Sequence, residues 1–111
     1  MLRPSHTQPI ERHRVFSGDF ATEPYECAWA TEALFFIRIE SLKGNKPELQ
    51  VSVQISPDGI NWVDEGTSFD VMRETGQAFV RVREFGGWLR LAGTTSKDAE
   101  IEVMIHLVLK G

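Results

Sequence analysis

The histidines and the single cysteine carry the most reactive side chains of this 111-residue chain. His6, His13 and His106 could act as general bases, and Cys27 could act as a nucleophile if a base lay beside it. No recognisable catalytic motif surrounds them, and Cys27 stands among large apolar residues, where a free cysteine usually serves as a small buried hydrophobe. We therefore predict a protein with no enzymatic activity, no catalytic residues and no cofactor.

Oxygen-bearing side chains gather around one turn. Asp58, Asn61 and Asp64 have the ligand type that calcium prefers, although their spacing does not match an EF-hand loop. An aspartate between a proline and a glycine more often closes its own turn through side-chain bonds to backbone amides. Calcium binding by Asp58 and Asp64 stays open on the sequence alone, but turn closure is favoured, and we predict no metal ligand.

The same segment has the residue order of a tight hairpin. In Ser56-Pro57-Asp58-Gly59, proline presets φ at the second position and glycine tolerates positive φ. Together with Trp62, the segment resembles the Ser-x-Asp-Gly-x-x-Trp hairpin of small β-sandwich modules, as in phage virion accessory proteins and carbohydrate-binding modules. The resemblance implies structural roles: Ser56 and Asp58 lock the turn, Gly59 takes positive φ, and Trp62 packs beneath. It implies no catalytic residue.

A second resemblance concerns two adjacent segments. Residues 79–83 read Phe-Val-Arg-Val-Arg, and residues 85–91 read Phe-Gly-Gly-Trp-Leu-Arg-Leu. They are similar to the paired strands of many jelly-roll modules, including carbohydrate-binding modules and phage head-decoration or tail-associated proteins. Gly86-Gly87 has the composition of a two-residue hairpin turn, which would make these segments neighbouring strands.

Alternation of apolar and polar residues dominates the chain from residue 12 onward. It is clearest in residues 49–56 and 101–110 and indicates half-buried strands. The weak helix candidates are residues 23–33 and a turn near residues 71–75. We predict one all-β domain over residues 12–111, a jelly-roll β-sandwich with about seven to nine antiparallel strands. The expected core consists of Phe35, Ile37, Ile39, Leu49, Val51, Val53, Ile55, Val80, Val82, Leu89, Leu91, Ile101, Val103, Ile105 and Leu107.

Residues 1–11 contain Pro4 and Pro9 and show no periodicity. Two readings are open: a frayed terminus, or an extended arm that docks onto a neighbouring subunit.

The predicted strands place arginines and aromatics away from the core. Such a face is typical of protein–protein interfaces, because arginine and aromatic side chains dominate their binding energy. Alternatively, this face is a second inward face of the sandwich, with the arginines paired to Glu40, Glu84 and Glu102. The predicted interaction face consists of Phe36, Arg38, Phe79, Arg81, Arg83, Trp88 and Arg90.

Composition and charge limit the function classes. The chain is 41% hydrophobic and carries 12 basic against 16 acidic residues, which fits a globular domain and argues against nucleic-acid binding. No secretory leader and no membrane-spanning apolar run are recognisable, so we expect synthesis in the cytoplasm and no membrane partner.

These limits favour a non-enzymatic structural or assembly protein. We expect a homo-oligomer, in the leading hypothesis a virion-associated accessory that binds a larger shell or tube. The alternative is a carbohydrate-binding module whose glycan stacks on Trp62 and Trp88.

Overall fold

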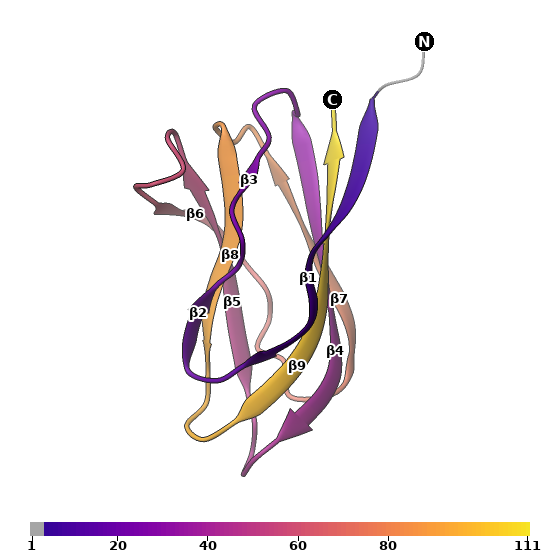
Figure 1. The fold of residues 1–111 in the computed structure, drawn as a ribbon, viewed down its shortest axis with the longest axis vertical. Helices are drawn as coiled ribbons and strands as arrows, with labels where there is room; N and C mark the ends of the chain where they lie inside the picture. Colours follow the sequence, from indigo (N-terminus) through magenta and orange to yellow (C-terminus); the bar gives the residue numbers. More distant parts are fainter. Residues whose placement is uncertain (1–3) are drawn as a thin grey trace.

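The computed structural model describes residues 4–111, and this part of the chain is built from strands (Figure 1). Residues 4–111 form no helix, and hence none that could cross a membrane. The nine strands are β1 (Ser5–Phe16), β2 (Asp19–Ala21), β3 (Tyr25–Glu26), β4 (Glu32–Lys43), β5 (Leu49–Ser56), β6 (Val63–Ser68), β7 (Gly76–Arg83), β8 (Trp88–Thr95) and β9 (Glu100–Lys110).

Two antiparallel sheets pack face to face. One has the order β1-β9-β4-β7 and the other β2-β8-β5-β6, with β3 also paired to β8. Because β2 and β3 both pair with β8, they act as one interrupted strand, and each sheet is then effectively four-stranded. This is the strand order of a jelly roll, in which most connections cross between the two sheets and β5–β6 is a hairpin within one sheet. The predicted jelly-roll β-sandwich is confirmed.

The core lies between the two sheets and follows from the period of two. In β9, every second residue from Ile101 to Leu109 is fully buried, and the residues between them face outward. All fifteen predicted core residues belong to the apolar cluster between the sheets, with Ile55 and Val80 at its partly exposed margin.

The N-terminal segment differs from the expected arm. Residues 5–11 belong to β1, which pairs with β9 from Ser5 opposite Lys110 onward. Pro9 is compatible with this placement because β1 is an edge strand, where a missing backbone donor breaks no ladder. Residues 1–3 of the predicted arm lie outside the described residues.

Two further expectations are corrected. The Gly86-Gly87 segment is not a hairpin turn: β7 and β8 lie in different sheets, and the segment crosses between them. The weak helix candidate at residues 23–33 contains β3 and the beginning of β4 instead, and residues 71–75 form only a bridge and a bend.

The two strands that pair with β9, β1 and β4, both have a register shift near the same residues of β9. The register of β1 against β9 shifts between Glu11 and Arg14, and that of β4 against β9 shifts between Ile39 and Ser41. Each shift inserts an extra residue, a β-bulge that re-aims nearby side chains. His13 lies in the first bulge with a positive φ of 50°, and Glu40 lies in the second.

Candidate interaction face

The outer face of the sheet β1-β9-β4-β7 carries an apolar band. Phe36 stands opposite Phe79, their ring centroids are 5.6 Å apart, and the Phe79 side chain is 53% exposed. Contiguous apolar patches on a surface often mark interaction sites. The band runs across the three strands β7, β4 and β9. It consists of exposed Phe79, partly buried Phe36, Met104 and Val108, and buried Leu34, and on β9 His106 stands opposite Phe36 between Met104 and Val108.

One end of this band is basic. Arg81 and Arg83 project from β7, and the ring of Phe79 lies 5.9 Å from the Arg81 guanidinium. Glu32 on β4 forms ion pairs with both arginines, at 3.1 Å from Arg81 and 4.0 Å from Arg83. Lys110 on β9 stands opposite Glu32. Among the strand residues at this end, one carboxylate, that of Glu32, therefore lies near three cationic side chains.

The opposite end of the band is acidic. Glu100 and Glu102 point outward from β9, and Glu40 lies next to them on β4. Arg38 approaches Glu40 at 3.7 Å and Lys43 stands opposite Glu100, which offsets part of this charge. The apolar band thus lies between ends of opposite sign.

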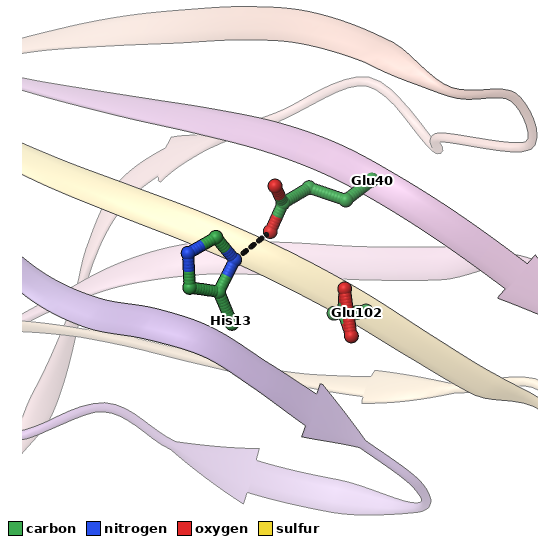
Figure 2. Close-up of side chains that lie close together, drawn as sticks. All are labelled: His13, Glu40 and Glu102. Atoms are coloured by element: carbon green, nitrogen blue, oxygen red, sulfur yellow. Dashed lines mark hydrogen bonds and ion pairs between the residues drawn. The ribbon is translucent and has the colours of Figure 1, made fainter.

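Three metal-ligating side chains meet at the acidic end. Figure 2 shows the His13 ring reaching over β9 toward Glu40, with Glu102 beside them. The distance from His13 Nδ1 to Glu40 Oε1 is 2.7 Å, and the ligand atoms of His13, Glu40 and Glu102 all lie within 4.8 Å of one another. Residue spacing in the sequence does not predict this group, because the group depends on two β-bulges and on strands far apart in the chain.

The structure divides the seven predicted face residues between the two sheets. Phe36, Arg38, Phe79, Arg81 and Arg83 share the face described above. Trp88 and Arg90 lie on the outer face of the other sheet, because β8 does not pair with β7. The expected cross-strand contact of Arg90 with Arg81 and Arg83 is therefore wrong, and the main carboxylate partner of those two is Glu32 rather than Glu40, Glu84 or Glu102.

Arg90 and the hairpin tryptophan form a separate stack. The Arg90 guanidinium lies 4.3 Å from the Trp62 ring centre and donates to Gln54 Oε1 at 2.8 Å. The ring that meets Gly59 is that of Trp88, since a Cβ on Gly59 would approach it to 3.0 Å. Trp62 and Trp88 are both partly buried, Trp62 against Arg90 and Trp88 against Gly59.

The hairpin side chains bond to their own turn. Asp58 Oδ1 accepts hydrogen bonds from the Ser56 hydroxyl and from the backbone amides of Ile60 and Asn61, each at 2.9 Å. The Asn61 side chain donates to Asp58 Oδ2 at 3.0 Å. These donors, the Asn61 and Ile60 amides first, hold the pKa of Asp58 well below its ordinary value. Such saturation favours turn closure over calcium binding.

We expect Asp58→Ala to lower the melting temperature by several degrees, because four donors lose their acceptor. These bonds stabilise the ionised carboxylate, because they lower the pKa of Asp58 in the folded state. Their contribution to stability is complete above the unfolded pKa of Asp58 and is lost as pH falls from there through the folded pKa. Thermal unfolding at neutral and acidic pH measures both effects. Asp64→Ala is the control, since Asp64 accepts one exposed bond from Gln54. Equal melting temperatures for the two variants would contradict the turn-locking role.

Cys27 has the environment expected of a structural residue. Its side chain is fully buried, and its thiol lies 3.5 Å from the carbonyl oxygen of Gly87. Burial, with a smaller contribution from the charge of Glu26, raises the pKa of the thiol to about 12. A protonated, inaccessible thiol is a poor nucleophile.

One open hollow lies beside the N-terminal end of β1. Trp29 is 49% exposed there, and the Tyr25 hydroxyl lies 3.0 Å from His6 Nε2. The hollow is lined by Pro4, Ser5, His6, Tyr25 and Trp29.

Fold and surface together define a jelly-roll β-sandwich domain with one exposed apolar sheet face. The chain belongs to the family described as Domain of unknown function (DUF6385), whose model matches residues 42–108. Among solved structures it is similar to the one titled "Crystal structure of PirA", with a TM-score of 0.51 and 12% identity over 96% of this chain and 93% of that chain. At this identity the likeness shows a shared fold. No match is found among curated proteins.

Proposed function

We propose that this domain is a non-catalytic assembly module that binds a second copy of itself through the outer face of β1-β9-β4-β7. The observation that carries the proposal is the apolar band, with Phe79 exposed and Phe36 partly exposed, between a basic and an acidic end. Burying Phe36 and Phe79 against a partner would remove their apolar surface from water, the main driving force of association.

Charge complementarity favours a second copy as the partner. A two-fold axis that reverses the strand direction brings the basic end of one copy toward the acidic end of the other, and the converse contact forms at the same time. The alternative axis, along the strands, would place like charges together. An antiparallel face-to-face dimer is therefore the arrangement that this surface supports.

The setting we propose is a phage-like virion accessory in which such dimers bind a larger shell or tube. Support comes from the resemblance of the Ser56–Trp62 hairpin to those of head-decoration and tail-associated modules. The jelly-roll strand order agrees with this class without being specific to it.

Light scattering across a concentration series tests self-association. We expect the measured mass to approach twice the 12.6 kDa of the chain, and Phe79→Ser to weaken the dimer at least about tenfold, or about 1.4 kcal/mol. Ile60→Ser is the matched control, because Ile60 is 78% exposed outside this face. A wild-type protein that stays monomeric at high concentration, or equal effects of the two substitutions, would argue against the proposal.

Carbohydrate binding is a second candidate, favoured by the hollow around Trp29. A half-exposed indole beside the Tyr25 hydroxyl and His6 offers a stacking surface next to hydrogen-bonding groups. Tryptophan fluorescence titrated with a panel of glycans tests it. A saturable fluorescence shift that requires Trp29 would support glycan binding. The absence of any fluorescence shift would argue against glycan binding and leave assembly as the only proposed function.

A further inference from the structure

The geometry points to a divalent transition-metal site formed by His13, Glu40 and Glu102. The three side chains come from three adjacent strands, β1, β4 and β9, and meet on the outer face of the sheet (Figure 2). A single copy contributes all three ligands, but Glu102 also belongs to the acidic end that the proposed dimer uses, so the site is tested on a monomeric variant as well as on the wild type.

The backbone around the group is arranged to bring these side chains together. His13 and Glu40 each lie in a β-bulge on opposite sides of β9, and the positive φ of His13 is a conformation that histidine seldom adopts. Two independent irregularities thus converge on Glu102, the outward-facing residue of the regular strand between them.

The negative charge of this group favours the binding of a cation. Glu40 and Glu102 place two carboxylates side by side, and no hydrogen bond or ion pair links the Glu102 carboxylate to any group in residues 4–111. Glu40 has the 2.7 Å contact with His13 and a longer one, 3.7 Å, with Arg38. A bound divalent ion would neutralise both carboxylates at once.

The spacing suits one ion after small side-chain rotations. Two ligands of a tetrahedral zinc ion lie about 3.4 Å apart, given zinc–ligand distances of about 2.0–2.2 Å. The present separations, from 2.7 Å up to 4.8 Å, require shifts of about 1 Å at exposed side-chain ends. The His13 side chain is 64% exposed, so the ion can enter and water can fill its remaining coordination positions.

The ligand set selects the class of metal. An imidazole nitrogen with two carboxylates suits zinc and similar transition metals, whereas calcium and magnesium prefer oxygen ligands throughout. The ion would occupy the position between His13 Nδ1 and Glu40 Oε1, and it requires the imidazole tautomer that carries its hydrogen on Nε2 and leaves Nδ1 free to coordinate.

Zinc competition with a chromophoric indicator over the micromolar range tests the site on the full chain. We expect saturable binding of one zinc ion, weakened at least tenfold by His13→Asn and by Glu102→Gln. Asparagine is chosen because it tolerates positive φ. His106→Asn and Glu100→Gln are the matched controls, with the same changes on the same face, and we expect binding within twofold of wild type.

Four outcomes would overturn the assignment: no saturable zinc binding by the wild type, equal loss in ligand and control variants, binding that survives both ligand substitutions, or saturation by calcium but not by zinc. Repeating the titration with Arg81→Glu/Arg83→Glu, which keeps all three ligands, separates this result from self-association. Zinc binding by that variant as a monomer would uphold the metal site whatever the fate of the dimer.

Discussion

Gly93→Ala should destabilise the domain by about 3 kcal/mol, the upper end of the range for overpacked interior sites. A Cβ at Gly93 would overlap the backbone carbonyl oxygen of Gln50 and would lie 3.0 Å from the Phe20 ring. Gly93 pairs with Phe20 on one side and Val51 on the other, so the backbone cannot retreat without breaking a ladder. Urea unfolding followed by tryptophan fluorescence measures the loss.

Gly86→Ala provides the comparison for this experiment. A Cβ there would lie 3.6 Å from the Ser56 carbonyl oxygen, an ordinary contact, and Gly86 is not among the positive-φ glycines. We expect a change within about 0.5 kcal/mol, or slight stabilisation through the unfolded state. Similar free energies of unfolding for the two alanine variants would show that the close approach of β5 and β8 does not require glycine.

Arg81→Glu combined with Arg83→Glu should leave the monomer folded and weaken the proposed dimer by at least about 2 kcal/mol, or about thirtyfold. Both side chains are more than half exposed, so their loss opens no cavity. In the antiparallel dimer they face acidic residues of the partner, and reversal sets like charges together. Light scattering and circular dichroism in chelator-containing, low-salt buffer measure association and folding.

A charge swap makes this test specific to the arrangement. Glu100→Lys/Glu102→Lys should also weaken self-association, whereas an equimolar mixture of the two double variants should form a heterodimer, because both ends are then complementary. Arg90→Glu is the matched control on the opposite outer face and should leave the dimer intact. A mixture that stays monomeric would contradict the antiparallel arrangement, and loss of the dimer in Arg90→Glu would place the interface on the other sheet.

The sequence predicted strands and their inward faces well, because these depend on local alternation. In β5 and β9 every second residue is apolar, and this period alone decides which side chains reach the core. Pairing between strands is not local. Gly86-Gly87 fits a hairpin turn as well as it fits a crossing between sheets, and the packing of the whole sandwich decides between them.

The candidate sites depended still more on distant pairing. Phe36 and Phe79 were assigned correctly to one face, but their charged neighbours Glu32 and Lys110 stand at the ends of strands that meet only in the folded sheet. His13 and Glu40 are 27 residues apart and come together through bulges, for which the sequence offers no clear signal. Pro9 suggested an irregular arm, although an edge strand accommodates it.

The position of β9 has a consequence for synthesis on the ribosome. The strand nearest the C-terminus of this domain is not at an edge but between β1 and β4, so neither can complete its pairing before Lys110 is available. In any polypeptide that contains this domain, the first sheet therefore cannot close until its last strand leaves the exit tunnel. Until then the edge of β4 that pairs with β9 has no partner strand, and nascent chains of this domain should rely on chaperones longer than chains whose sheets close in sequence order.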